Sequence, residues 1–239
     1  MKILKILNKK MQATKKNYIK GFTLVELAIV IVVIGLVVAG VTAGQAVVKQ
    51  ARLKGVITDI NQFKAAYNAF RTKYNAIPGD MSNAQSYWPT AFANGNANRR
   101  LETNNERYGF WQHSALAGVI PGVYSGQFGV AVDRPEASIK NGSYRAMDTT
   151  ATCYGKTGNR YVMEGDSDTI GVILAADAYS LDVKMDDGLA DKGKVFSTTP
   201  NLVAGAGTEC TTGSWNPISA SAEYNLDVTD RYCRMLFWF

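Results

Sequence analysis

The feature that most constrains this chain is an apolar run from residue 22 to residue 44 in which Glu26 is the only charged residue. At about 1.5 Å per residue, 23 helical residues extend about 34 Å, which is enough to cross a hydrocarbon core of about 30 Å. We therefore predict a transmembrane helix over residues 22–44. An ionisable group inside such a helix is costly and usually has a partner, so Glu26 needs an explanation.

Positive charge is concentrated ahead of this run. Residues 1–20 contain seven lysines and no acid. Positive flanks are retained in the cytoplasm, so we expect a single-pass membrane protein with a cytoplasmic N-terminus and a C-terminal part that faces the periplasm or the exterior. The formal net charge is +6, but beyond residue 20 only 19 of the 26 basic side chains remain against 20 acidic ones. This balance argues against nucleic acid as a partner, because phosphate binding needs a basic surface.

Two simpler interpretations of the N-terminus compete with a permanent membrane helix. One is a secretory signal peptide cut near the small residues Val41-Thr42-Ala43, and the other is a plain signal anchor. The apolar run is longer than the roughly 7–15 residues of a usual signal peptide. Neither interpretation explains why a carboxylate stands at Glu26.

A family resemblance rests on the residues around the start of the run, which read Lys20-Gly21-Phe22-Thr23-Leu24-Val25-Glu26 before the apolar residues 27–38. This order resembles the processing site of type IV prepilins and type II secretion pseudopilins. The resemblance implies that a prepilin peptidase removes a basic leader, residues 1–21, by cutting between Gly21 and Phe22. It also implies that Phe22 becomes N-methylated, and that Glu26 meets the Phe22 amine of a neighbouring subunit and sets the register of a filament.

The stretch after the run is amphipathic. Apolar residues recur at spacings of three and four, which predicts one buried helix face: Leu53, Val56, Ile57, Ile60, Phe63, Tyr67, Phe70 and Tyr74. We expect one nearly continuous helix from about residue 22 to about residue 75, roughly 80 Å long, whose part over residues 45–77 is an amphipathic stalk. Pro78 and Gly79 should end it, because proline disfavours helix in the residue before it.

The remainder, residues 78–239, is expected to form one globular α+β head. We predict helices near residues 82–88 and 107–119, and β-prone runs at residues 128–132 and 160–163 within a turn-rich stretch. Residues 169–176 are expected to form a strand that feeds a helix reaching Val183, and residues 235–239 a terminal strand on the stalk. The predicted fold is an α+β, pilin-like lollipop: a long N-terminal transmembrane and stalk helix packed against a small antiparallel sheet.

The three cysteines are Cys153, Cys210 and Cys233, and none belongs to a pattern of metal ligands. Three disulfide pairings exist. A bond between Cys210 and Cys233 is favoured because it would close a C-terminal loop and contribute roughly 3 kcal/mol. Cys153 is then left over, as a small buried residue or as a member of another pair.

Residues for catalysis are scarce. The chain has one histidine, His113, on a predicted helix beside aromatic residues, where packing is the preferred interpretation. The aromatic residues Tyr87, Trp88, Trp111 and Trp215 are expected to fill the core under a sheet in preference to stacking on a ligand. We therefore predict that the protein is not an enzyme and requires no cofactor.

Two acidic groups are candidate calcium sites, because Ca²⁺ prefers several carboxylate oxygens on a turn. The first comprises Asp182, Asp186, Asp187 and Asp191. The second comprises Glu164, Asp166 and Asp168. Neither matches an EF-hand loop, since the acids before Gly188 are misplaced and Thr169 stands where the second loop needs glycine. Solvated turns are the preferred interpretation of both groups.

The expected function is structural: a subunit of a type IV pilus or of a type II secretion pseudopilus, with the filament in the periplasm or at the cell surface. The implied partners are copies of itself, other pilins or pseudopilins, the prepilin peptidase, the inner-membrane assembly platform with its motor, and membrane lipid. One alternative is a minor pilin that acts as an adhesin or as a DNA-uptake module. A second, less favoured, is a membrane-anchored periplasmic enzyme.

Overall fold

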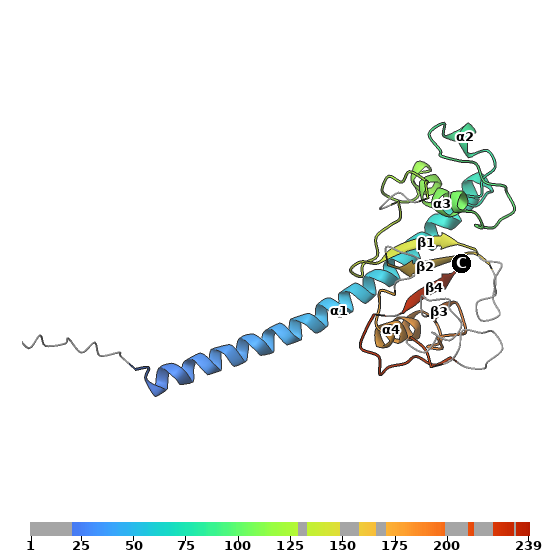
Figure 1. The fold of residues 1–239 in the computed structure, drawn as a ribbon. Coiled ribbons are helices and arrows are strands. Elements are labelled where there is room, and N and C mark those ends of the chain that lie inside the picture. The colour runs from blue at the N-terminus through green and yellow to red at the C-terminus, as the bar shows by residue number, and fades with distance from the viewer. Residues whose placement is uncertain are drawn as a thin grey trace, which may run out of the picture. The chain divides into compact units, whose positions relative to one another are not determined.

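The computed structural model describes residues 21–128, 133–148, 158–165, 171–198, 210–212, 222–231 and 233–239. The chain divides into two units, residues 1–47 and residues 48–239. The helices are α1 (Leu24–Tyr74), α2 (Ala84–Tyr87), α3 (Asn104–Leu116) and α4 (Ala175–Met185). The strands are β1 (Ser143–Met147), β2 (Arg160–Glu164), β3 (Val195–Thr198) and β4 (Arg234–Trp238), as Figure 1 shows. The predicted α+β class, with a long N-terminal helix and a small antiparallel sheet, is confirmed.

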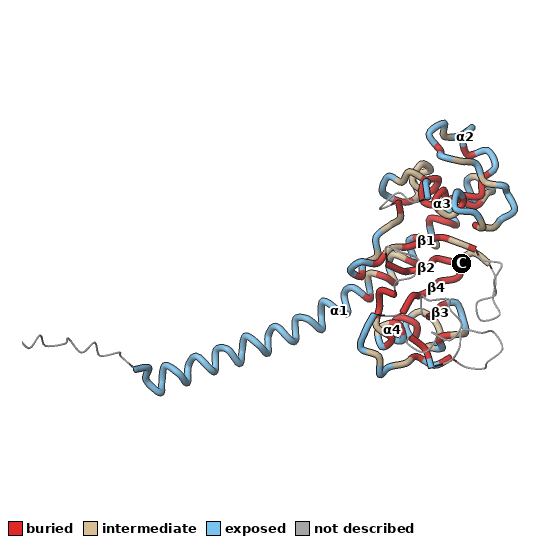
Figure 2. The backbone as a smooth tube through the Cα atoms, viewed as in Figure 1, coloured by how far each residue is buried: buried red, intermediate tan, exposed pale blue. Residues whose placement is uncertain are grey.

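Helix α1 is one continuous helix, but its surroundings change along its length. Every residue from 21 to 52 is exposed, as the pale blue stretch in Figure 2 shows. From residue 53 onward one face is buried at the predicted spacings of three and four residues: Leu53, Val56, Ile60, Phe63, Tyr67 and Phe70. The other two residues of the predicted stripe, Ile57 and Tyr74, are half-buried. The amphipathic pattern therefore identified the face that packs into the core.

The C-terminal end of α1 lies where the sequence predicted it. Asn75 adopts a left-handed conformation with a φ of 49° and donates its backbone N–H to the Arg71 carbonyl, a common way to close a helix. Gly79 follows with a φ of 83°. A Cβ at this position would come within 2.1 Å of the Glu106 carbonyl oxygen, so only glycine lets this turn approach α3.

The four strands form one antiparallel sheet in the order β1-β2-β4-β3. In β2, Arg160 to Met163 pair with Trp238 to Met235 of β4. Side chains alternate between the two faces of a strand. Accordingly Tyr161 and Met163 join the main core, whereas Val162 belongs to a smaller cluster on the other face with Phe196, Leu236 and Trp238.

Phe63 of α1 lies at the centre of the main core. Its ring centroid is 5.1 Å from that of Tyr144 in β1, 5.6 Å from that of Tyr161 in β2 and 5.0 Å from that of Trp111 in α3. The Tyr161 hydroxyl also donates to the Phe63 carbonyl oxygen at 3.0 Å. Edge-on aromatic pairs of this kind stabilise a core beyond simple burial. The second half of α1 is therefore an integral part of residues 48–239.

Several predicted elements of the head are confirmed with shifted bounds. Helix α2 lies within the predicted residues 82–88, and α4 continues two residues beyond Val183. Helix α3 begins three residues before the predicted start because Thr103 and Glu106 form a capping box. Strands β2 and β4 are where they were expected, and the ring of Phe239, just after β4, contacts Tyr67 of α1 with a centroid distance of 4.7 Å.

The strand predicted over residues 169–176 is wrong for the part that the structure describes. Only Ile173 pairs there, in an isolated bridge with Cys233, and α4 already begins at Ala175. Strand β3 was not predicted. Residues 129–132, most of another predicted β-prone run, lie outside the described residues.

Candidate processing and assembly site

The residues at the start of α1 are accessible. Gly21, Phe22 and Thr23 precede the helix, have no regular secondary structure and are exposed. Gly21 is not among the residues with positive φ, and a Cβ built there would meet no described atom within 4 Å. Neither backbone conformation nor packing within the described residues requires a glycine at this position.

A capping box fixes where α1 begins. The Thr23 hydroxyl accepts from the Glu26 backbone N–H at 3.2 Å, and Oε2 of Glu26 accepts from the Thr23 backbone N–H at 2.9 Å. The same Oε2 also accepts from the Thr23 hydroxyl at 2.9 Å. These bonds satisfy two groups that a helix N-terminus leaves without partners. The sequence signal for this capping box is a threonine followed three residues later by a glutamate.

The capping box places the acid in the first turn of α1, where a negative charge also favours the helix dipole. Only Oε2 of Glu26 takes part in hydrogen bonds among the described residues. The other carboxylate oxygen, Oε1, accepts no hydrogen bond from any described residue. It is therefore available to a partner.

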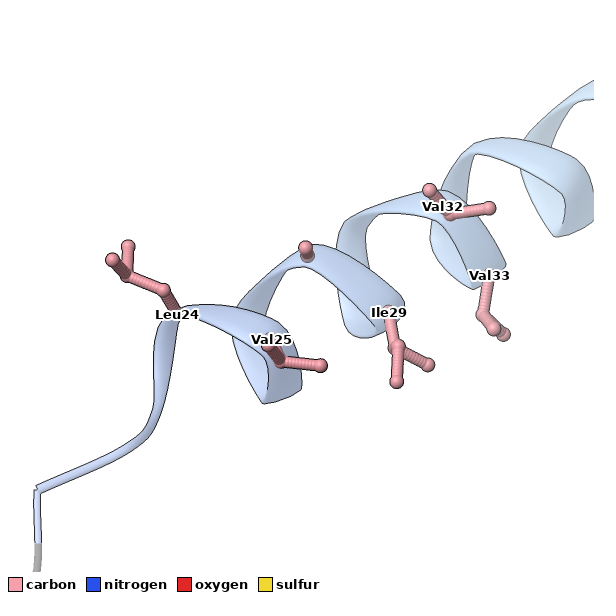
Figure 3. Close-up of a pocket in the computed structure, with 6 residues that line it drawn as sticks. Leu24, Val25, Ile29, Val32 and Val33 are labelled. Atoms are coloured by element: carbon pink, nitrogen blue, oxygen red, sulfur yellow. The ribbon is translucent and has the colours of Figure 1, made fainter.

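The helix surface beyond Glu26 is apolar and uncovered. Figure 3 shows Leu24, Val25, Ile29, Val32 and Val33 projecting from α1 with no other segment against them. Sixteen large apolar side chains between Phe22 and Val48 are exposed, and at roughly 1.5–3 kcal/mol each their burial would contribute roughly 25–50 kcal/mol. A contiguous apolar surface of this size is unusual on a soluble domain and indicates contact with lipid or with another protein.

Among the described residues α1 is the one helix that is long and apolar enough to cross a membrane, by length and composition. The apolar part of α1 is not buried inside the protein, which distinguishes it from the core helix of a soluble domain. A partner for the apolar surface, lipid or other helices, must therefore come from outside the described chain.

His113 has a structural role. Its Nδ1 accepts from the Gly79 backbone N–H at 2.9 Å, and its Nε2 lies 3.3 Å from the Ala93 carbonyl oxygen. Burial lowers the pKa of the ring to about 4, so the imidazole is neutral at pH 7. Both ring nitrogens are occupied by backbone groups, which agrees with the predicted packing role.

The first acidic group lies together in part. Carboxylate oxygens of Asp182, Asp186 and Asp187 lie within 4.8 Å of one another. However, Asp182 accepts from the Tyr224 hydroxyl at 2.8 Å and from the Gly188 N–H at 3.3 Å. Burial raises the pKa of Asp182 to about 6, against the effect of these bonds.

The other members of this group also bind backbone. Asp186 accepts from the Val195 N–H at 3.0 Å, and Asp187 accepts from the Leu189 N–H at 2.9 Å. Asp191 accepts from the Ala222 N–H at 3.1 Å. Hydrogen bonds to these loops thus account for the four acids. Solvated turns stay the prediction for this group, and a calcium ion stays the less favoured alternative.

Glu164, from the second acidic group, is completely buried and surrounded by arginines. It forms ion pairs with Arg134 at 3.0 Å, Arg145 at 2.8 Å and Arg234 at 3.4 Å. These cations occupy both carboxylate oxygens, so Glu164 ties β2 to β1 and β4 and is poorly placed to bind a metal. Asp166 and Asp168 lie outside the described residues.

Cys210 and Cys233 form a disulfide in the structure, with Cα atoms 5.1 Å apart. The bond closes a loop next to the Ile173 bridge.

Of the aromatic residues considered as ligand platforms, Trp111 is fully buried and Trp88 is half-buried, whereas Tyr87 is exposed. Cys153 and Trp215 lie outside the described residues.

The N-terminal part of the chain matches a known family model. The family model described as the prokaryotic N-terminal methylation motif matches residues 16–42. No curated protein and no solved structure matches the chain. The matched residues include Gly21, Phe22, Glu26 and the exposed apolar part of α1. Residues 16–42 are therefore the prepilin-type cleavage and methylation motif of type IV pilins and pseudopilins.

Proposed function

We propose that the chain is the precursor of a structural filament subunit. Prepilin peptidase cuts it between Gly21 and Phe22, removes residues 1–21 and methylates the new amine of Phe22. The observation that carries this proposal is the coincidence of the methylation motif with an apolar helix surface that the described chain leaves uncovered. Residues 22–44 hold the subunit in the inner membrane until assembly, residues 45–77 form the stalk, and residues 78–239 complete a periplasmic head.

The accessibility of the scissile bond supports the proposed cut. Gly21 and Phe22 lie outside the helix, so a protease can bind them as extended backbone. Since nothing in the described fold requires glycine at position 21, its small size serves an external partner. The active site of the peptidase, where a side chain would obstruct close approach to the backbone, is that partner.

Glu26 has a role in assembly that follows from the cut. Cleavage creates an ammonium group on Phe22, next to the capping residue Thr23 and four residues from Glu26. The Glu26 carboxylate of one subunit can form an ion pair with the Phe22 ammonium of its neighbour. Each charge then compensates the other, so that neither is isolated in an apolar environment. Oε1, which accepts no hydrogen bond within the described residues, can make this contact while Oε2 stays in the capping box.

The filament is that of a type IV pilus or a type II secretion system, which both use subunits with this motif. Helices of neighbouring subunits cover the apolar surface of α1 with one another once the subunit leaves the lipid. The assembly platform, its motor and other pilins or pseudopilins are the remaining partners.

The substitution Glu26→Ala tests the assembly role. We expect the variant to be cleaved normally, because the scissile bond is unchanged, but to be absent from sheared filaments, as measured by immunoblot against the membrane fraction. Asp227→Ala, which removes an exposed acid from the head, is the matched control and should assemble normally. Normal incorporation of Glu26→Ala would remove the proposed role of the carboxylate.

A further inference from the structure

A polar cleft lies at the C-terminal end of α1, within residues 48–239. Its volume is about 470 Å³, and its walls come from the last turns of α1, the turn over residues 75–83, the loop over residues 97–99 and Asn159. It includes none of the residues of the processing site. Its features therefore need an explanation of their own.

The backbone around this cleft is strained. Among the described residues only four non-glycine residues have positive φ, and two of them, Ala97 at 60° and Arg99 at 67°, lie in one loop of the cleft, whereas Asn75 at 49° closes α1. A left-handed conformation costs roughly 1–2 kcal/mol for a residue with a Cβ. Such strain persists only where the surroundings enforce it, and it gathers at ligand sites.

Asp80 enforces the strained loop. Its carbonyl oxygen accepts from the Ala97 N–H at 3.0 Å, and its Oδ2 accepts from the Arg99 N–H at 2.6 Å. Asn159 adds a third tie, because its Nδ2 donates to the Arg99 carbonyl oxygen at 2.9 Å. Asp80 is only 2% exposed, and its Oδ1 has no hydrogen-bond partner among the described residues. A buried carboxylate thus holds Arg99 in a fixed, strained position at the wall.

Two arginines bring positive charge to the cleft. Arg71 lies over the Tyr67 ring, with its guanidinium carbon 5.4 Å from the ring centroid, and Arg99 lines the cleft from the loop. Tyr67, Arg71 and Arg99 all line the same cleft. Burial raises the pKa of Tyr67, and the charges of the two arginines act in the opposite direction. Neither arginine forms an ion pair within the described ranges, and Asp80 is the only acid in the lining.

We propose that this cleft binds the oxyanion of a small ligand, a carboxylate or a phosphate, between the guanidinium groups of Arg71 and Arg99. Guanidinium groups suit such ligands because their planar array of donors matches two oxygens of one anion. The Tyr67 hydroxyl is a further donor at the same place. The site lies within residues 48–239, where α1 meets the head, and does not depend on cleavage at Gly21.

Titration of the full-length protein in detergent micelles tests the proposal. The probes are sodium glucuronate, inorganic phosphate and neutral glucose, at constant ionic strength and with calorimetric detection. Saturable binding of glucuronate or phosphate is expected, and the ligand that binds identifies the type of oxyanion. Glucose should not bind. Absence of saturable binding by both anions, or equal binding of glucose and glucuronate, would overturn the proposal.

Two variants examine the assigned residues. Arg71→Gln changes an exposed side chain, and Arg99→Asn removes the guanidinium while keeping a residue type that tolerates positive φ. Each should raise the dissociation constant about tenfold or more, as loss of a charged hydrogen bond predicts. Arg52→Gln, an exposed arginine of α1 outside the cleft, is the control of equal charge change and should bind like the unmodified protein. Unchanged binding by Arg71→Gln and Arg99→Asn, with melting temperatures that show intact folds, would contradict the site.

Discussion

The two ends of α1 differ in where their apolar residues lie and in whether the described chain covers them. From Leu53 to Phe70 the apolar stripe is buried by the sheet and α3, and polar residues take the other side. From Leu24 to Val48 apolar residues occur all round the helix, and the described chain covers none of them. A residue whose type is required by contacts within the described fold has a structural role. A residue whose type no such contact requires indicates a partner. Gly21 and the apolar surface belong to the second kind, whereas the capping box with Thr23 explains Glu26 in part.

The largest effect should come from Gly21→Val. A branched side chain at position 21 meets no described atom, so the fold and melting temperature should not change. It should nevertheless abolish cleavage on co-expression with prepilin peptidase, measured as the loss of the faster-migrating mature band. Gly35→Ala, also in open space but distant from the cut, is the control and should be processed. Efficient cleavage of Gly21→Val would mean that the glycine does not serve the peptidase.

Glu164→Gln should have the largest effect on the stability of residues 48–239. It removes the buried charge that pairs with Arg134, Arg145 and Arg234, and breaking a buried ion pair typically costs about 3–5 kcal/mol. Denaturant unfolding measures the loss, while cleavage at Gly21 should be unaffected. Glu102→Gln, in a partly exposed pair with Arg100, should cost about 1 kcal/mol or less. Equal stability of the two variants would show that the Glu164 cluster does not stabilise the sheet.

His113→Gln should change how stability depends on pH. The folded ring binds a proton only near pH 4, whereas the unfolded ring binds one near pH 6.5. Protonation therefore favours the unfolded chain between these values, and this loss should reach about 3 kcal/mol at pH 4. The difference in unfolding free energy between protein and variant, measured from pH 7.5 to pH 4, isolates this contribution. A difference that does not vary with pH would contradict the buried neutral histidine.

The smallest effect should follow from Thr23→Val, which keeps the shape of the side chain but removes the hydroxyl of the capping box. Loss of an N-cap costs about 1 kcal/mol, confined to the first turn. Faster hydrogen exchange at the amides of Val25 and Glu26 in micelles would report the loss. Thr42→Val loses only a bond to the Ala39 carbonyl within the helix and should leave those amides unchanged. Unchanged exchange in Thr23→Val would show that the capping box does not hold the helix start.

Local patterns were the part of the fold that the sequence could predict. The stripe from Leu53 to Phe70 and the helix end before Pro78 follow from spacing and from proline sterics, and both are found in the structure. Strand β3 is four residues long and pairs with β4 about forty residues later, so no local periodicity indicates it. The predicted strand before α4 failed for a similar reason, because Ile173 has only one pairing partner, Cys233.

The candidate sites divide in the same way. Gly21, Phe22 and Glu26 stand close together in the sequence, so their order identified the motif directly. The cleft between Arg71 and Arg99 depends on a loop held by Asp80 and Asn159, which lie 19 and 60 residues from Arg99. Residues brought together over such separations carry no joint signal in a single sequence.

We expect a processing enzyme to recognise and cut residues 16–42, which are then more than a membrane anchor. Intact mass spectrometry of the membrane form, from cells with active prepilin peptidase, tests it most directly. The mature chain should begin at Phe22 and carry one added methyl group. A chain that still contains residues 1–21, or one that begins near Gly44, would contradict it.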